Sequence, residues 1–432
     1  MNPLIQRLSQ RNQNKQIGAY SACTANDTAL TAVMERAAQT DTLALIEATS
    51  NQVNQYGGYT GMRPADFVTY ARKLADDTGL AASSLVLGGD HLGPLTWQNE
   101  PEESAMAKAE TLVRDFVLAG FSKIHLDTSM RLADDDKIKI LSDEIIARRA
   151  ARLCKVAEDA FKEYSKANKN AYAPVYVIGS EVPVPGGAFD NDESVSVTTP
   201  EQFENTLCAF REQFQKAGLR HAFERVIGVV VQPGVEFSDL TVTEYDSIKA
   251  RSLCGALRKY PGLVFEGHST DYQTREKLKE MVMDGIAILK VGPALTYAFR
   301  QGLFALEDIE RELLPAGDAC LSNFRDVLET TMLSKPGYWQ KYYQGQPSEV
   351  ALKRKYSLSD RCRYYLPDSA VAASIQQLIH NINGVDMPIS LLEQYMPLQY
   401  KKYRSGMIDK NAQSLLKEHI KRYADDYIYA IT

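Results

Sequence analysis

An acid and a histidine directly follow a short apolar run in the stretch Leu85-Val86-Leu87-Gly88-Gly89-Asp90-His91-Leu92-Gly93-Pro94. A short apolar run without alternation is typical of a strand that is buried on both faces in a parallel sheet. Asp90 and His91 then stand where this strand ends and the chain turns. A carboxylate beside an imidazole can move protons or bind a metal, so this stretch is the first candidate site.

Polar residues end several other strand-like runs in the same way. Residues two apart on a strand face the same side, so Glu266 and His268 can both point toward one site. Carboxylates and imidazoles that converge from several strands are the ligands that a divalent cation such as zinc requires. A single residue of this kind is more often a structural hydrogen-bonding group, but a set at one rim favours a functional site. The set is Glu47 with Thr49, Asp90 with His91, Asp127, Glu181, Gln232, Glu266 with His268, and Gly292.

Lys290 lies inside an apolar strand-like run and allows two interpretations. Burial can lower the pKa of a lysine enough for Schiff-base chemistry. Alternatively, Lys290 forms an ion pair with a strand-end acid, and the surplus of acids nearby favours the ion pair. His125 lies inside its own run, which indicates a packing role, and no role is assigned to His221, His380 or His419.

The segments that position these residues alternate between strand-like and helix-like patterns. Capping residues or prolines such as Asn26, Pro64 and Pro200 open several of the helices. Eight strands, each followed by a helix within about 300 residues, predict a (β/α)8 TIM barrel, an α/β fold that gathers the strand ends at one mouth. A doubly wound sheet is the competing architecture, but no Gly-x-Gly-x-x-Gly follows the first strand. The strand-like segments are 17–23, 43–49, 85–94, 123–128, 175–181, 226–232, 263–268 and 287–291.

The alternation ends after residue 313. We therefore expect the barrel to cover residues 1–313 and a helical extension to cover residues 314–432. The extension holds 12 of the 23 tyrosines of the chain. Tyrosine suits interfaces because its apolar ring carries a polar tip. These tyrosines either bind a partner or pack the extension on the barrel.

Composition excludes several classes of protein. The 432 residues are 44% hydrophobic and 24% charged, which is typical of a soluble globular protein. A net charge of −6 offers no basic surface for nucleic acid. No apolar run approaches the roughly 20 residues that span a bilayer, and the polar N-terminus is no secretory signal. The six cysteines form no Cys-x-x-Cys pair, which favours reduced thiols in the cytoplasm.

Long motifs along nearly the whole chain resemble one family. They include GGDHLGP at 88–94, EVPVPGG at 181–187, HSTDYQT at 268–274, LKVGPALT at 289–296 and YSLSDR at 356–361. These motifs, with IEATSNQVNQ at 46–55, GGYTGM at 57–62, FSKIHLD at 121–127 and VQPGVEF at 231–237, are similar to those of the Z-type subunit of tagatose-1,6-bisphosphate aldolase.

The resemblance implies a role in bacterial galactitol or N-acetylgalactosamine catabolism. There the Z-type subunit accompanies a catalytic Y-type subunit, supports its activity and stability, and is inactive alone. Such proteins have also been labelled tagatose-6-phosphate kinases. No Gly-x-x-x-x-Gly-Lys loop for nucleotide phosphates occurs in this sequence, which argues against that label.

The Y-type subunit is a zinc-dependent class II aldolase, and a distant likeness to it assigns roles to the strand ends. Asp90 would move protons and His91 would bind zinc. From the strand-end set, Glu181 is a second candidate catalytic residue. Where such aldolases have two further histidine ligands, this chain aligns Gln232 and Glu266, and a shift of two residues offers His268 instead. The run Lys290-Val291-Gly292 corresponds to a segment that helps to hold phosphate.

These departures weaken the predicted metal centre. Three neutral imidazoles leave zinc its full charge to polarise a ketone, whereas an amide binds weakly and a carboxylate neutralises charge. We therefore expect a divalent metal such as zinc to be weakly bound or absent in the isolated chain. Two functions remain open. One is an accessory barrel subunit that binds a Y-type partner, and the other is an independent metal-dependent lyase using His91, Glu266 and His268.

Two further expectations concern the mouth of the barrel. The glycine-rich segment 50–62 leaves strand two at this rim, and we predict that it folds over the mouth. A sugar phosphate would be held by backbone N–H groups and hydroxyls of Ser269, Thr270 and Gly292, with charge from Lys290 if no acid claims it. The surrounding acids should make this binding weak without a divalent ion.

Overall fold

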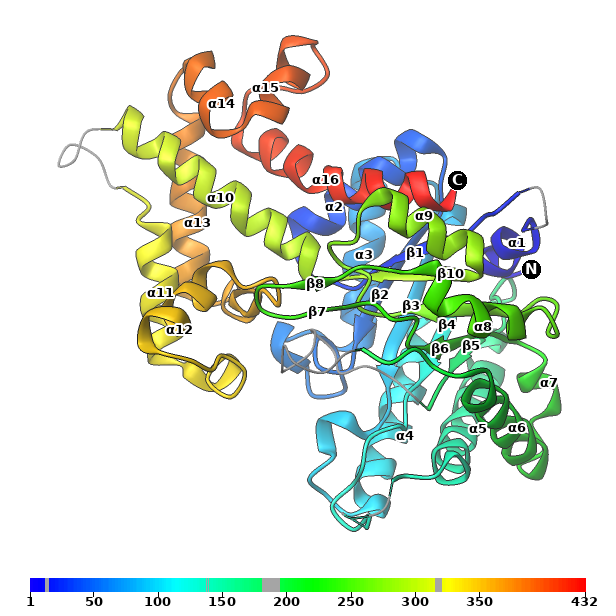
Figure 1. Ribbon diagram of the computed structural model, residues 1–432. Coiled ribbons are helices and arrows are strands. Elements are labelled where there is room, and N and C mark those ends of the chain that lie inside the picture. Colours follow the sequence, from blue (N-terminus) through cyan, green and yellow to red (C-terminus); the bar gives the residue numbers. More distant parts are fainter. Residues whose placement is uncertain (12–14, 137, 139, 181–194, 315–320) are drawn as a thin grey trace.

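The structure is a computed structural model that describes residues 1–11, 15–136, 138, 140–180, 195–314 and 321–432. Its centre is a closed barrel of eight parallel strands in the order β1-β10-β9-β6-β5-β4-β3-β2 (Figure 1). The predicted (β/α)8 barrel is confirmed, and closure excludes an open doubly wound sheet. The barrel strands are β1 (Ala19–Ala22), β2 (Ala44–Thr49), β3 (Leu85–Leu92), β4 (Lys123–Leu126), β5 (Val175–Ile178), β6 (Val226–Val231), β9 (Val264–Gly267) and β10 (Ile286–Val291).

A helix follows each barrel strand and packs outside it (Figure 1). Local sequence fixes several helix starts, since the Asn26 side chain accepts a hydrogen bond from Ala29 N and Pro64 occupies the first turn of its helix. Within the residues described, no helix has the length and apolar character that crossing a membrane requires. The outer helices are α2 (Asp27–Thr40), α3 (Pro64–Thr78), α4 (Glu102–Ala119), α5 (Asp143–Ala167), α6 (Pro200–Lys216), α8 (Ser247–Leu257), α9 (Arg275–Asp284) and α10 (Pro293–Leu313).

The barrel interior changes from apolar to charged along its axis. Helix α1 (Pro3–Ser9) inserts Leu4 and Leu8 into an apolar cluster with Leu45, Val264 and other strand residues. Side chains two positions further along a strand point to the same side. At this spacing Glu47, Glu266 and Lys290 follow Leu45, Val264 and Ile288 of the cluster. They lie in the barrel interior together with Lys123, and all four are buried.

Short elements and a helical extension complete the fold. The strands β7 (Glu236–Phe237) and β8 (Val242–Thr243) form an antiparallel hairpin after β6, and α7 (Arg220–Phe223) precedes β6. The 3-10 helices are η1 (Gly58–Thr60), η2 (Ala82–Ser84), η3 (Pro94–Trp97), η4 (Pro336–Tyr338) and η5 (Arg361–Tyr365). The extension comprises α11 (Phe324–Ser334), α12 (Pro347–Tyr356), α13 (Ser369–Asn383), α14 (Ile389–Tyr395), α15 (Pro397–Arg404) and α16 (Ala412–Ile431).

The last helix of the extension returns to the barrel. Helix α16 packs against α2, α9 and α10 (Figure 1). The carbonyl of Ile431 accepts a hydrogen bond from Gly18 N at 3.2 Å, next to β1. Arg36 of α2 pairs with Asp425 at 2.6 Å. The division of the chain at residue 313 stays a prediction, and α16 links the two predicted parts closely.

Candidate active site

Four buried charges form a layer across the barrel interior. Lys123 Nζ lies 2.5 Å from Glu47 Oε1 and 2.7 Å from Glu266 Oε2. Lys290 Nζ pairs with Glu47 and lies 2.8 Å from Asp90 Oδ1 and 3.5 Å from Glu266 Oε1. Charges are tolerated in a protein interior only when they are paired. The expected ion pair of Lys290 is confirmed, and burial lowers the pKa of its amine to about 8, so it stays protonated at neutral pH.

A glycine makes room for this layer. A Cβ atom on Gly88 would lie 2.6 Å from Glu47 Oε1, well inside contact distance. The glycine of β3 therefore lets the Glu47 side chain cross toward Lys123 and Lys290. Lys123 was not singled out from the sequence, because a lysine at the start of an apolar run resembles a surface residue. Its spacing of two from His125 was the available signal, since both then face the interior.

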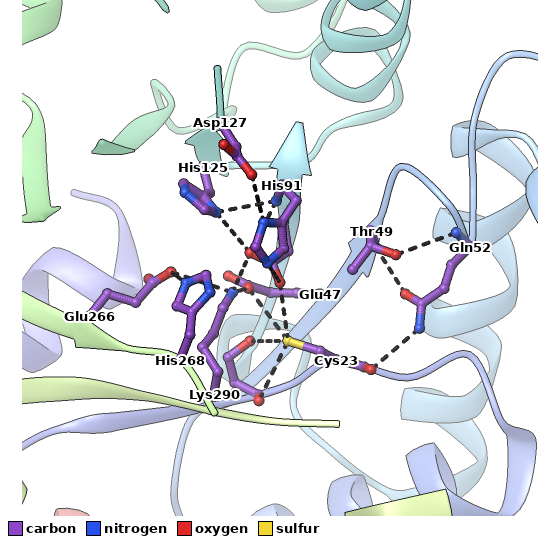
Figure 2. Close-up of polar contacts among 12 residues, drawn as sticks. Cys23, Glu47, Thr49, Gln52, His91, His125, Asp127, Glu266, His268 and Lys290 are labelled. Carbon is purple, nitrogen blue, oxygen red and sulfur yellow. Dashed lines mark hydrogen bonds and ion pairs between the residues drawn. The ribbon is translucent and has the colours of Figure 1, made fainter. Parts of the chain in front are cut away.

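Three histidines, which Figure 2 labels, meet with Asp90 beside the charged layer. Asp90, His91, His125 and His268 each offer one ligand atom, and these atoms lie within 4.8 Å of one another. The ring centroids are 5.1 Å apart for His91 and His125, 4.9 Å for His91 and His268, and 5.2 Å for His125 and His268. The expectation that His125 only packs was wrong, because its Nδ1 lies 2.9 Å from Asp90 Oδ1 inside the barrel.

His91 is held in an unusual backbone conformation. Its φ of 49° lies in the left-handed region, which costs energy in a residue other than glycine and is common at functional sites. Its Nδ1 lies 2.7 Å from Asp127 Oδ2, which leaves Nε2 as its remaining ring nitrogen. Burial alone would lower the pKa of His91, but Asp90 and Asp127 raise it to about 9.

The pKa values of Asp90, Glu266 and His268 are all shifted downward. Burial tends to raise the pKa of Asp90, but the charge at His91 and the hydrogen bond with His125 hold it well below its usual range. Burial also opposes ionisation of Glu266, yet Lys123 and His268 lower its pKa to about 2. Burial lowers the pKa of His268 despite its contact with Glu266.

The donor set fits a divalent metal such as zinc. Imidazole and carboxylate are the common zinc ligands outside thiolate sites. Among the residues that the structure describes, His125 Nε2 is buried without a hydrogen-bond partner, which is costly unless something binds it. Asp90, His91, His125 and His268 would hold the ion. A metal held here would act as a Lewis acid toward a bound oxygen.

The predicted ligands lie in different surroundings. His91 and His268 belong to the cluster, whereas Glu266 Oε1 lies 3.0 Å from His268 Nε2 and orients that ring. Gln232 Oε1 accepts hydrogen bonds from Gly234 N and Val235 N at 2.9 and 3.0 Å, so it is committed to the turn after β6. The ligand roles of these residues stay predictions. Glu181 lies outside the described residues.

A pocket of about 680 Å³, open mouth included, lies over the cluster. Tyr59 lines it, which confirms that segment 50–62 folds over the mouth, while the side chain of Tyr56 is 70% exposed. Gln52 anchors the segment, since its Nε2 donates to Cys23 O and its Oε1 accepts from Thr49 N (Figure 2). The lining residues are Cys23, Thr49, Asn51, Gln52, Tyr59, Asp90, His91, Phe237, His268, Ser269, Asp271, Lys290, Val291, Gly292, Pro293, Arg363 and Tyr364.

The groups expected to hold phosphate already have partners in the chain. Gly292 N and Ala294 N, at the start of α10, donate to Asp271 Oδ1 at 3.0 and 2.8 Å. Thr270 Oγ1 donates to Lys290 O at 2.6 Å and lies 2.9 Å from Tyr427 Oη. Of the predicted phosphate-binding residues, Thr270 and Gly292 are thus engaged, and Lys290 is committed to acids. Their role with phosphate stays a prediction that these contacts do not favour.

Asp271, Arg363 and Tyr364 line the pocket, although no sequence pattern indicated a role for them. Burial raises the pKa of Asp271 to about 6, although its backbone hydrogen bonds oppose this rise. Arg363 and Tyr364 reach the pocket from η5, almost a hundred residues beyond β9 in the sequence. No local pattern in the sequence indicates that this part of the extension meets the mouth of the barrel.

Comparisons with known proteins give one family. A sequence model described as D-tagatose-1,6-bisphosphate aldolase subunit GatZ/KbaZ-like matches residues 4–432. A crystal structure of a probable tagatose 6 phosphate kinase from Sinorhizobium meliloti 1021 is similar at 42% identity and a TM-score of 0.86, covering 96% of this chain and 100% of that one.

Two aldolase structures are much more distant. Fructose-bisphosphate aldolase from Campylobacter jejuni shares 12% identity at a TM-score of 0.44, covering 92% of this chain and 93% of that one. The YdjI aldolase from Escherichia coli K12 shares 10% identity at a TM-score of 0.39, covering 86% of this chain and 98% of that one.

Proposed function

The chain belongs to the GatZ/KbaZ-like family of D-tagatose-1,6-bisphosphate aldolase subunits, and from this premise we propose that it is an accessory subunit of that aldolase. It binds a catalytic Y-type subunit and supports its activity and stability in the catabolism of galactitol or N-acetylgalactosamine through tagatose 6-phosphate. This role belongs to the cytoplasm, where sugar phosphates are metabolised, and the described cysteines are all free thiols.

The observation that carries the proposal is the position of Lys290. Its ammonium lies between Glu47, Asp90 and Glu266, so a charge of the chain itself pairs with the acids at the base of the pocket. Asp271 likewise occupies the backbone N–H groups at the start of α10. A pocket base in which these charges are already paired within the chain is stable without a bound substrate, as suits a supporting subunit.

A second candidate function is supported by the histidine cluster. Asp90, His91, His125 and His268 offer the ligand types of a zinc site at the mouth of a TM barrel. This arrangement favours an independent metal-dependent lyase that acts on a sugar phosphate. Such an enzyme would need the proton on His91 to leave before the metal binds.

One experiment separates the two functions. The chain, a Y-type subunit, and both together are assayed with zinc for cleavage of tagatose 1,6-bisphosphate, and the residual activity of the Y-type subunit is followed during heating. An accessory subunit co-purifies with the Y-type subunit, raises its activity and half-life, and shows no turnover alone. Turnover by the isolated chain, or no effect on the Y-type subunit, would overturn the proposal.

Variants of the histidine cluster sharpen the same assay. If the chain is an accessory subunit, His268→Ala leaves the activity of the Y-type complex unchanged, because the chemistry occurs in the other subunit. If the chain is a lyase, this substitution abolishes its turnover. His221→Ala is the matched control, since this histidine is fully outside the cluster and its side chain is 92% exposed.

A further inference from the structure

The outer wall of the pocket comes from the extension, and it is fixed to the barrel. Asp360, directly before η5, accepts hydrogen bonds from Thr296 Oγ1 at 2.6 Å and from Arg300 Nε at 2.9 Å, both on α10. Tyr272 Oη donates to Leu358 O at 2.6 Å from the loop after β9. These buried contacts hold η5 in one position over the mouth, so its side chains are part of the pocket.

Arg363 is the residue of η5 that brings positive charge to the pocket. Its Nη1 donates to the carbonyls of Ser359 and Asp360, and its Nη2 donates to Tyr364 Oη at 3.0 Å. The guanidinium also lies 4.5 Å from the centre of the Tyr364 ring. A guanidinium has five N–H donors, so donors remain after these contacts.

Arg363 differs from the buried lysines in the groups that surround its charge. Lys123 and Lys290 are surrounded by carboxylates at the base of the pocket. In the part of the chain that the structure describes, Arg363 forms no ion pair, and its hydrogen bonds go to carbonyls and a phenol. The charge of Arg363 acts to lower the pKa of the pocket acid Asp271. The Oδ1 atom of Asp271, however, accepts hydrogen bonds from the amides at the start of α10.

Arg361, the second arginine of η5, does not line the pocket and is engaged by tyrosines. Arg361 Nε donates to Tyr338 O at 2.5 Å, and its guanidinium lies 3.1 Å from the centre of the Tyr342 ring. Both arginines lower the pKa of Tyr364 against the effect of burial, which would raise it. Arg363 therefore brings a positive charge to the pocket in addition to the acids and lysines that are paired at its base.

We propose that Arg363 binds the phosphate group of a phosphorylated sugar, while the sugar hydroxyls reach toward His91 and Lys290, which line the same pocket. This inference rests on the proposed function for the class of ligand, a sugar phosphate, and it assigns the recognition of phosphate to the extension. Arginine suits this task because its planar donors match phosphate oxygens and its charge is permanent. The proposal also explains how phosphate binds although Gly292 and Thr270 are engaged elsewhere.

The test is calorimetry of the full chain with tagatose 6-phosphate and with unphosphorylated tagatose, in the presence of zinc. Arg363→Gln should weaken the binding of tagatose 6-phosphate by about 10- to 100-fold, the usual loss for one charged hydrogen bond. It should leave the affinity for tagatose unchanged, which a merely structural role would not do. Arg363→Lys should keep part of the affinity, because it keeps the charge but not the fork of donors.

The control is Arg404→Gln, an exposed arginine of α15 whose guanidinium lies 5.7 Å from the ring of Tyr400. It should bind both ligands as the wild type does. Three results would overturn the proposal: no binding of tagatose 6-phosphate by the wild type, wild-type affinity in Arg363→Gln, or an equal loss of both ligands with a lowered melting temperature. None of these results bears on the association with a Y-type subunit, which tests the proposed function separately.

Discussion

Asp271 Oδ1 lies 3.0 Å from the backbone nitrogen of Gly292, so a carboxylate of the chain itself caps the first turn of α10. The start of a helix attracts anions because its first N–H groups have no partner within the helix. In this chain the anion is supplied internally, by a residue that follows β9. The contact joins the ends of two neighbouring barrel strands and lies on the wall of the pocket.

Asp271 should make the stability of the protein depend on pH. Burial raises its pKa to about 6 in the folded state, above the usual value of 3.8. Because the pKa is raised in the folded state, the protonated carboxyl of Asp271 stabilises the fold. This stabilisation is fully present below the pKa of the unfolded chain and is lost as the pH rises through about 6. Asp271→Asn cannot ionise and keeps an oxygen for the two amides.

We therefore expect the wild type to lose stability relative to Asp271→Asn as the pH rises from about 4 to 7. The difference between their free energies of unfolding should change by up to about 3 kcal/mol in favour of the variant. Urea unfolding at a series of pH values measures the difference. Asp386→Asn is the control, because that carboxylate is exposed on the surface. A difference that stays constant over this range would show that Asp271 is ionised throughout.

Zinc binding should release a proton from His91. The pKa of His91 is about 9, so its ring must lose a proton before a metal can bind near neutral pH. The affinity for zinc should therefore rise by close to tenfold per pH unit between about 7 and 9. Titration calorimetry in buffers of different ionisation enthalpy measures the number of protons that are released when zinc binds.

Single substitutions in the cluster test which residues hold the ion. His91→Ala and His268→Ala should each weaken zinc binding by 100-fold or more, about 2.7 kcal/mol, since each removes a ligand. His380→Ala, on the extension helix α13, should change nothing. Zinc binding that is independent of pH, or that survives both substitutions, would place the metal elsewhere.

The barrel itself could be predicted because its pattern is local. Each strand-like run and the helix after it are recognisable within about 30 residues, and eight repeats leave few architectures. The same logic placed His91, His268 and Lys290 at one mouth, because the ends of parallel strands meet there. These predictions needed no knowledge of which side chains touch.

The partners of these residues could not be predicted, because they depend on contacts between distant parts of the chain. His125 looked like a packing residue until Asp90, from the neighbouring strand, came within hydrogen-bonding distance. Thr270 looked free to bind phosphate, but Tyr427 returns from the C-terminal helix to contact it. Arg363 reaches the pocket only because Asp360 is held by α10, which the alternation of strands and helices does not reveal.

Removal of Lys290 should destabilise the protein strongly. Lys290→Met is close in length but leaves Glu47, Asp90 and Glu266 with one lysine fewer in the barrel interior. Loss of one partner from a buried ion pair costs about 3–5 kcal/mol. Lys277→Met, which removes a partly exposed pair with Glu280 on α9, should cost less than about 1 kcal/mol. Urea unfolding at neutral pH compares the two, and equal costs would mean that Lys290 is not charged in the fold.

Gly88→Ala should disturb the same layer by a steric route. The added methyl group would lie 2.6 Å from Glu47 Oε1, so the glutamate must move away from its lysine partners. Overpacking of this kind costs about 1–3 kcal/mol. In Gly255→Ala, on α8, the methyl group meets no atom within 4 Å, and the change should be neutral or stabilising. A Gly88→Ala protein as stable as the wild type would show that the layer adapts easily.

The extension should be needed for the barrel to fold. Helix α16 buries Leu416, Ile420 and Tyr427 against the barrel helices, and Tyr427 Oη donates to Thr270 O at 2.9 Å. A chain that ends at residue 313 would expose the apolar faces of α2, α9 and α10 that α16 covers. Exposed apolar surface of this extent favours aggregation.

We therefore expect the 1–313 chain to be insoluble or to lack a cooperative unfolding transition, whereas the full chain unfolds cooperatively. Calorimetry and size-exclusion chromatography measure both properties. Two single substitutions on α16 make the test independent of truncation. Tyr427→Ala should destabilise the full chain by about 3 kcal/mol or more, since it empties a buried site. Tyr429→Ala should have little effect, because that side chain is 45% exposed. A soluble 1–313 chain with a sharp transition would instead establish the barrel as an independent domain.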